Sequence, residues 1–176
     1  MHGPLMQRKS FGNLPCPIAR SLERVGEWWS ILIMRDALHG LTRFDEFQKS
    51  LGIAPNMLTR RLNSLVETGL LERRRYSERP PRDEYVPTEC GREFRPVLQA
   101  MLAWGNRHFA PEGASVLIVN RETGETADPV LVDRVSGLPL SDPVFRSAPG
   151  PAADHRVRRR YDGRDPKAAD SVKAPS

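Results

Sequence analysis

No run of 18 apolar residues occurs in the 176-residue chain, and the chain contains only two cysteines, Cys16 and Cys90. Because a membrane-spanning helix needs about 20 consecutive apolar residues, we expect neither such a helix nor a membrane partner. Two cysteines cannot build a disulfide framework, and they suit a reducing compartment. Residues 1–13 lack the apolar stretch of a secretory signal, so we expect a flexible N-terminus and a cytoplasmic location.

Patterns of catalytic and metal-binding residues are also lacking. No glycine-rich phosphate loop, nucleophile–base pair or carboxylate pair stands in a motif context. The histidines are scattered without the spacing of metal ligands, at His2, His39, His108 and His155. We therefore expect no catalytic residue, no metal and no cofactor, and an enzyme is disfavoured.

Positive charge is present but unevenly distributed. The formal net charge is +5, and residues 146–173 contain eight basic and four acidic side chains. The rest of the chain is nearly neutral, yet residues 55–82 hold seven arginines against three glutamates. A basic segment inside a balanced domain is typical of a nucleic-acid contact surface.

Proline, glycine and apolar spacing predict four helices, over residues 17–25, 27–38, 44–51 and 55–68. The third and fourth helices are joined by a turn that contains Gly52 and ends at Pro55, which is the helix-turn-helix pattern. On the fourth helix Leu58, Leu62 and Leu65 share one side, which therefore faces the core.

Two β-strands are predicted next, over residues 70–76 and 83–86, with a proline-stiffened loop at 77–82. Three helices followed by an arginine-bearing hairpin are the order of a winged helix, so the fold class is mainly α (α+β). Thr88 is the expected N-cap of a long helix to Phe109, which Pro96 should kink. The apolar stripe of this helix favours dimerisation, and packing onto the first helix is the alternative.

The last third of the chain has a different composition. Residues 116–120 and 129–135 are predicted to be two strands of a small β-hairpin appendage, which spans 111–141. Residues 142–176 are rich in proline, alanine, glycine and charge, so we expect a disordered basic tail. This tail would either attract DNA without sequence preference or merely keep the chain soluble.

Four segments have the order and spacing of a known family: residues 16–20 (CPIAR), 26–36 (GEWWSILIMRD), 43–47 (RFDEF) and 54–62 (APNMLTRRL). Together with residues 76–85 they resemble HxlR-type regulators, and the winged-helix domain is assigned to residues 14–110. One departure is Pro87, which should shorten the second strand. The resemblance implies a dimeric winged-helix transcription factor, either repressor or activator, and some members respond to electrophiles or oxidants through a cysteine.

Some relatives carry a segment like a zinc ribbon after the winged helix. Thr123, Asp133 and Ser136 stand at the corresponding spacing in this chain, but every thiolate position has been replaced. Structural zinc needs four Cys or His donors close together. The resemblance therefore implies a degenerate ribbon that keeps a hairpin without metal.

A helical wheel of the fourth helix directs Asn56, Arg60 and Asn63 outward, with Thr59 and Arg61 on the flanks. We expect Asn56, Thr59 and Arg60 to read bases, because asparagine pairs with adenine and arginine with guanine. Arg61 is expected to reach phosphate. Further phosphate contacts are expected from Arg43, Arg73, Arg74, Arg75, Arg79 and Arg82. For each residue of the fourth helix, the alternative is a solvated helix face without a DNA contact.

Cys16 lies where the first helix begins, and a helix N-terminus stabilises a thiolate. Together with the resemblance, this makes Cys16 a candidate redox or electrophile sensor, with a small molecule or a reactive electrophile as effector. A buried, inert thiol is the alternative.

The patterns together predict a sequence-specific transcriptional regulator, most simply a repressor, that binds double-stranded DNA as a homodimer on an inverted-repeat operator. The alternative is a protein–protein interaction module with a winged-helix fold that no longer binds DNA.

Overall fold

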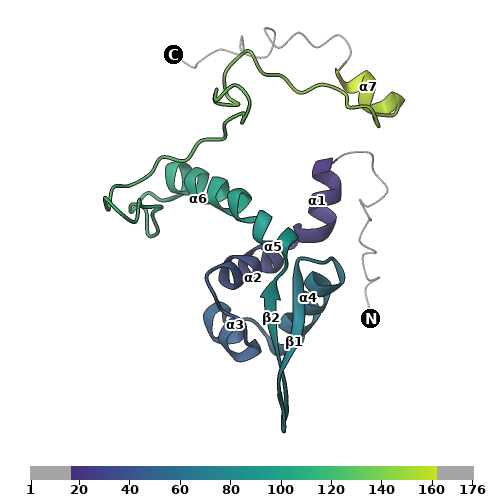
Figure 1. Ribbon diagram of the computed structural model, residues 1–176, viewed down its shortest axis with the longest axis vertical. Coiled ribbons are helices and arrows are strands. Elements are labelled where there is room, and N and C mark those ends of the chain that lie inside the picture. The colour runs from purple at the N-terminus through teal and green to yellow at the C-terminus, as the bar shows by residue number, and fades with distance from the viewer. Residues whose placement is uncertain (1–16, 162–176) are drawn as a thin grey trace, which may run out of the picture. The chain divides into compact units, whose positions relative to one another are not determined.

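A computed structural model describes residues 17–161, so the predictions for Cys16 and for residues 1–13 lie outside it. The described residues belong to two compact units, residues 21–130 and the remainder, and each is treated by itself. The secondary structure, drawn in Figure 1, is α1 (Pro17–Val25), α2 (Trp28–Leu38), α3 (Phe44–Leu51), α4 (Pro55–Glu67), β1 (Leu71–Glu78), β2 (Pro81–Pro87), α5 (Glu89–Glu93), α6 (Arg95–Phe109) and α7 (His155–Tyr161).

The hydrophobic core lies between α2, α3, α4 and the base of the hairpin. Its fully buried side chains come from all four elements: Ile33, Met34, Phe47, Leu58, Leu62, Leu65 and Leu71. Asp36 is buried among them and is satisfied by Arg35 Nε at 2.8 Å and by the Ser50 hydroxyl at 2.7 Å. Because the serine lies at the end of α3, this contact fixes α3 against α2.

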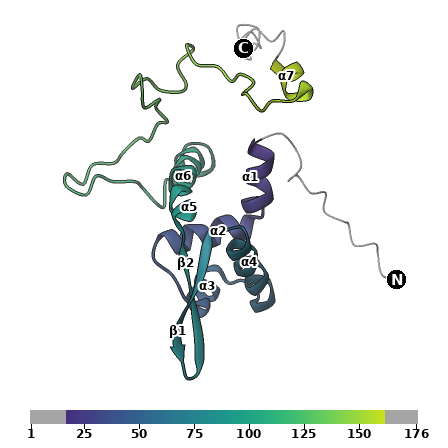
Figure 2. The same cartoon turned by 45° about the vertical axis from the view of Figure 1, so that its right-hand side comes forward.

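The predicted wing is confirmed as an antiparallel hairpin, and it is longer than expected. Leu71 pairs with Pro87 at its base and Glu78 pairs with Pro81 near its tip, so only Arg79 and Pro80 lie between the strands. The pairs Ser77–Arg82 and Glu78–Pro81 extend the ladder into the predicted loop, and Arg75 and Asp83 form a cross-strand ion pair just before it. Figures 1 and 2 both show this hairpin projecting beyond α2, α3 and α4.

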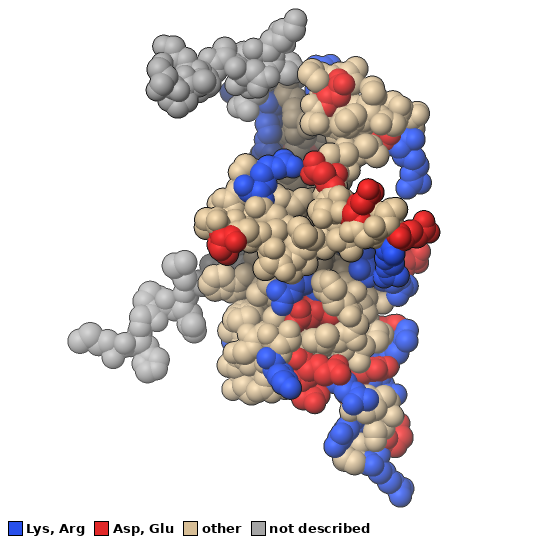
Figure 3. All heavy atoms as spheres, turned by 90° about the vertical axis from the view of Figure 1, so that its left-hand side faces the viewer, with Lys and Arg blue, Asp and Glu red and all other residues tan. Residues whose placement is uncertain are grey.

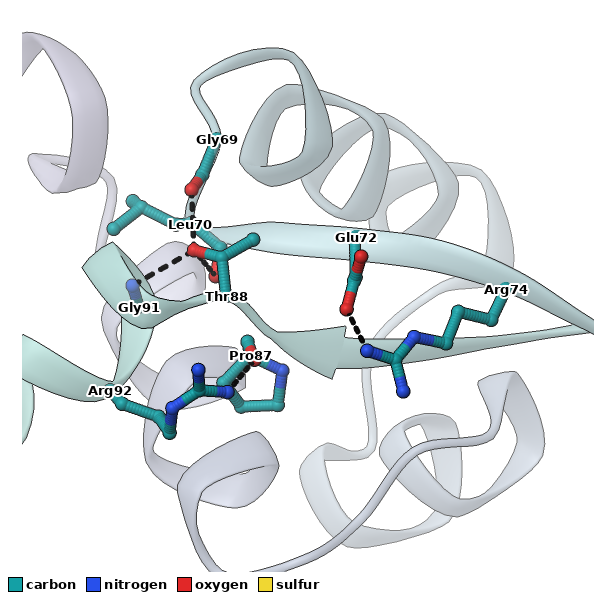
Figure 4. Close-up of polar contacts among 8 residues, drawn as sticks. All are labelled: Gly69, Leu70, Glu72, Arg74, Pro87, Thr88, Gly91 and Arg92. Atoms are coloured by element: carbon teal, nitrogen blue, oxygen red, sulfur yellow. Dashed lines mark hydrogen bonds and ion pairs between the residues drawn. The ribbon is translucent and has the colours of Figure 1, made fainter.

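The base of the wing is held to the following helix by Thr88 (Figure 4). Its hydroxyl donates to the Gly69 carbonyl at 2.7 Å and accepts from the Gly91 N–H at 3.1 Å, so Thr88 is the N-cap that the sequence predicts. Arg92 adds a bond from its guanidinium to the Pro87 carbonyl at 2.7 Å. Gly91 itself is buried against the Leu70 carbonyl, where no side chain fits.

The long helix predicted after the wing is interrupted, as expected, close to Pro96. Helix α5 ends at Glu93 and α6 begins at Arg95, because a proline ring lacks the N–H that would continue the ladder. Arg95 donates to the Leu38 carbonyl of α2 at 3.0 Å. No residue of α6 is buried, and its apolar side chains Val97, Met101, Trp104 and Phe109 are between 44% and 65% exposed.

The β-hairpin predicted within residues 111–141 is wrong in its pairing. The segment 116–120 does not pair with the segment 129–135. Each of them instead takes part in a separate local turn. In the first turn Asn120 N–H donates to Glu125 O at 2.9 Å, and Val119 bridges Thr126. The second repeats this arrangement 13 positions later: Asp133 N–H donates to Leu138 O at 2.8 Å, and Val132 bridges Pro139.

Side-chain bonds explain why local turns form instead of a longer hairpin. Asn120 Oδ1 accepts from the Glu122 N–H at 2.8 Å, and Asp133 Oδ2 accepts from the Ser136 N–H at 2.8 Å. Such bonds close a turn within a few residues and compete with strand pairing. Among residues 17–161 no group of histidine, cysteine and carboxylate side chains is arranged to hold a metal.

The prediction of disorder throughout the tail is also wrong for residues 155–161, which form α7. Asp154 caps this helix, because its Oδ1 accepts from the Val157 N–H at 2.9 Å. The sequence analysis did not predict this cap, because the composition of the segment indicated disorder. In the described part of the chain, no helix is both long and apolar enough to cross a membrane.

Candidate nucleic-acid interface

Helix α4 separates its side chains as the helical wheel predicts. Leu58, Leu62 and Leu65 are completely buried, whereas the opposite face consists of the exposed side chains Asn56, Thr59, Arg60 and Asn63. Pro55 at the first helical position sets the backbone for helix, and Gly52, with φ of +60°, turns the chain into this start. The buried leucines thus fix which polar groups point to solvent.

The polar groups on this face have few partners within the protein. Among residues 17–161, the only hydrogen bond of the Arg60 side chain goes to the Met57 sulfur, at 3.6 Å, and the Asn56 side chain makes none. The Thr59 hydroxyl donates to the Pro55 carbonyl at 3.0 Å, so it is left with acceptor capacity and a methyl group. Asparagine and arginine side chains can form hydrogen bonds with the edges of DNA bases, and a methyl group can make an apolar contact with thymine.

Arg61 lies apart from this face. Its side chain is 22% exposed, and Nη2 lies 3.0 Å from Oε2 of Glu27, the residue before α2. Its Nε is buried without a hydrogen-bond partner. Arg61 therefore packs between α4 and α2, and its side chain does not join that of Arg60 on the exposed face of α4.

The wing arginines fall into two groups. Arg75 donates from Nε to Asp83 at 2.7 Å and lies 3.6 Å from Glu78, and this hydrogen bond and charge raise its pKa. Arg74 pairs with Glu72. The exposed arginines Arg73, Arg79 and Arg82, by contrast, have no ion pair within the described chain. Figure 3 shows several blue basic side chains along the lower end, where the wing lies, with red acidic side chains among them.

Arg43 connects the helix-turn-helix to the wing. It precedes α3, bridges Glu84 of β2, and its guanidinium carbon lies 4.9 Å from the centre of the Tyr76 ring. The β1–β2 register shifts between Arg75 and Ser77, so Tyr76 stands at a bulge. Sequence reasoning missed Tyr76, although an aromatic residue directly after three arginines was a signal for it.

The Arg43 backbone is held by a capping box. Glu46 accepts from the N–H groups of Thr42 and Arg43, each at 2.9 Å. These backbone hydrogen bonds hold the pKa of Glu46 below its ordinary value, so the side chain stays ionised at neutral pH. Arg43, Tyr76 and Arg82 line an open cleft of about 390 Å³ between the start of α3 and the wing.

The chain is similar in sequence to known proteins. Residues 24–113 match the family described as HxlR-like helix-turn-helix. An HTH-type transcriptional regulator of Mycobacterium bovis is 38% identical over 135 residues, which cover 76% of this chain and 85% of the relative.

Two solved structures agree with this match. A candidate transcription factor from Pseudomonas aeruginosa has 59% identity, covers 82% of this chain and 99% of its own, and superposes with a TM-score of 0.61. A second candidate transcription factor has 42% identity, covers 80% and 99%, and gives a TM-score of 0.70. With the winged helix and the exposed face of α4, these matches show that the chain belongs to the HxlR-like helix-turn-helix family of transcriptional regulators.

Proposed function

We propose that the protein is a homodimeric repressor that recognises an inverted-repeat DNA operator. The observation that carries this proposal is the exposed face of α4, where Asn56, Arg60 and Asn63 have unused hydrogen-bonding groups opposite fully buried leucines. A helix of this kind enters the major groove by its first turns.

Base readout is assigned to three residues of α4. Asn56 offers a bidentate pair to adenine and Arg60 to guanine, each worth about 1–3 kcal/mol of discrimination. Thr59 offers its methyl group to thymine, because its hydroxyl proton is used within the helix. Asn63 lies one to two turns further along and is the fourth candidate.

Phosphate contacts are assigned to Arg43, Arg73, Arg79 and Arg82, which are exposed and keep their charges available. Arg75 and Arg74 have carboxylate partners in the wing and Arg61 has Glu27, so these three are proposed to shape the interface instead. Phosphate contacts fix the orientation of the protein, and the α4 contacts supply the sequence preference.

Dimerisation is supported by α6. Val97, Met101 and Trp104 recur at helical spacing, and they stay 44% to 58% exposed in the single chain. A second copy would remove this stripe from water. We expect Met101→Glu to shift the mass in light scattering from dimer to monomer. Gln99→Glu, which adds the same charge on the opposite side of the helix, should leave the dimer intact.

The decisive experiment is selection of bound sequences from a random DNA pool by the purified protein. An enriched inverted repeat, with half-sites about 10 base pairs apart or a multiple of this, is the expected result. Arg60→Gln should lose the preference at one position of each half-site, whereas Arg121→Gln, outside the interface, should not. No enrichment by a folded dimer would overturn the proposal and favour a protein–protein interaction module.

The direction of regulation has its own test. Occupying successive major grooves blocks access to the promoter, so transcription in vitro from a template with the selected operator should fall as protein is added. An increase would identify an activator.

A further inference from the structure

Helix α7 has the highest density of positively charged side chains among the helices and strands of the described chain. Its seven residues include four exposed arginines, Arg156, Arg158, Arg159 and Arg160, and no acidic side chain. The formal net charge of the whole protein is +5, so this one helix supplies most of the excess positive charge. Asp154, the carboxylate directly before the helix, accepts from the Val157 N–H at 2.9 Å.

The arginines of α7 have no carboxylate partner within the part of the chain that the structure describes. No ion pair from α7 occurs among residues 17–161, and only Arg158 uses its guanidinium, donating to the Ala153 carbonyl at 3.1 Å. Arg156 lies three and four positions before Arg159 and Arg160, so like charges are neighbours on one side of the helix, which destabilises it. A helix this short is also marginal in water. A polyanion would remove the repulsion.

We propose that α7 binds the phosphate backbone of double-stranded DNA, next to the operator contacts of α4 and the wing. The inference rests on the proposed function, because it takes the same DNA as the ligand. Guanidinium groups match phosphate geometry with two parallel N–H bonds, which favours arginine over lysine for this task. The proposed contact is to phosphates, which carry no sequence information, so it should be equally strong on any duplex.

The connection to α7 allows such a contact. Residues 141–154 contain no helix or strand, and a chain of this length spans at most about 45 Å. One turn of DNA is about 34 Å long, so a connection of this length does not confine α7 to a single position along a bound duplex. Its contribution is the same on every sequence, and it raises affinity without changing specificity.

The test compares two full-length variants with the same loss of charge. R156Q/R159Q/R160Q removes three arginines of α7, and R121Q/R134Q/R146Q removes three other exposed arginines. Affinities are measured between about 50 and about 200 mM salt for the selected operator and for a scrambled duplex of equal length. Circular dichroism and light scattering check that both variants fold and assemble like the parent.

We expect the α7 variant to reduce the slope of log affinity against log salt by about 3 for each protomer. Raising the salt concentration fourfold should therefore weaken DNA binding by the parent more than binding by the variant, by a factor of about 40 for each α7. Operator and scrambled duplex should be affected equally, so their affinity ratio stays constant. The control variant should change the slope by less than about 1.

Three results would overturn the inference: an unchanged slope, an equal change in the control, or a change on the operator alone. Vesicles with phosphatidylserine test the competing partner. If the α7 variant loses vesicle binding while its DNA slope matches the parent, α7 binds membrane surfaces instead. Failure of the proposed function has a different signature, because the parent would then bind operator and scrambled duplex equally.

Discussion

Arg61 and Glu27 form an ion pair, with 3.0 Å between Nη2 and Oε2, that joins α4 to the start of α2. The neighbouring residue, Arg60, points to solvent and has no carboxylate partner in the described chain. Two adjacent arginines on one helix are thus divided between packing and the exposed surface. This difference determines which of the two arginines can contact DNA.

Arg61→Gln should therefore lower stability and leave the electrostatics of DNA binding unchanged. Loss of the partly buried ion pair with Glu27 is expected to cost about 1–2 kcal/mol, measured by urea unfolding. Arg79→Gln is the matched variant, and it should keep stability within about 0.5 kcal/mol while its salt slope falls by about 1. A reduced slope in Arg61→Gln would contradict its assignment to packing.

Tyr76 should support DNA affinity through Arg43. Tyr76→Leu removes the ring under the guanidinium, which is worth about 0.5–1 kcal/mol at an exposed site, so affinity should fall about two- to fivefold. Tyr76→Phe keeps the ring and is expected to bind like the parent. The measurement is a titration of the selected operator by fluorescence anisotropy. Equal losses in both variants would show that the hydroxyl matters and the ring does not.

Gly91 and Gly105 should respond to alanine in opposite directions. A Cβ on Gly91 would lie 2.1 Å from the Leu70 carbonyl oxygen, so Gly91→Ala forces the base of the wing apart and should cost about 2–3 kcal/mol. Around Gly105, inside α6, no described atom other than those of its chain neighbours and the nearby helix backbone lies within 4 Å of the new Cβ. Gly105→Ala should therefore stabilise by about 0.5–1 kcal/mol. Chemical unfolding of both variants checks the pair, and stabilisation by Gly91→Ala would show the close approach to be wrong.

The capping box at α3 predicts a pH dependence of stability. The pKa of Glu46 is lowered in the folded state by the backbone hydrogen bonds from Arg43 and Thr42. Its contribution is therefore complete above the ordinary carboxyl pKa and is lost as pH falls through the folded value. Glu46→Gln should be less stable than the parent near neutral pH, and the two should converge as the pH falls below about 4. A constant difference across this range would mean that the ionised carboxylate contributes nothing.

Much of the fold follows from local patterns. Pro17, Gly52 and Pro55 mark helix boundaries, the leucines of α4 mark its buried side, and Thr88 and Pro96 mark the start and the break after the wing. These signals act over a few residues, so they can be read without knowing the rest of the structure. The exposed positions of Asn56, Thr59 and Arg60 follow from the same helical period.

Local signals were also present where the predictions failed. Asn120 and Asp133 close their own turns, and Asp154 caps α7. The sequence predictions relied on composition and on strand patterns. A single side chain that accepts a backbone N–H leaves no such pattern, so these turns and this cap were not predicted.

Local patterns suffice to predict the helix-turn-helix, the wing and the exposed face of α4, because these depend on periodicity and on proline and glycine. Which arginines keep their charge available depends on the folded structure. Arg61 pairs with Glu27 and Arg75 with Asp83, whereas Arg43 lies against the Tyr76 ring and keeps its charge available. An ion pair or a ring contact depends on distance in space, and packing of the leucine core sets that distance.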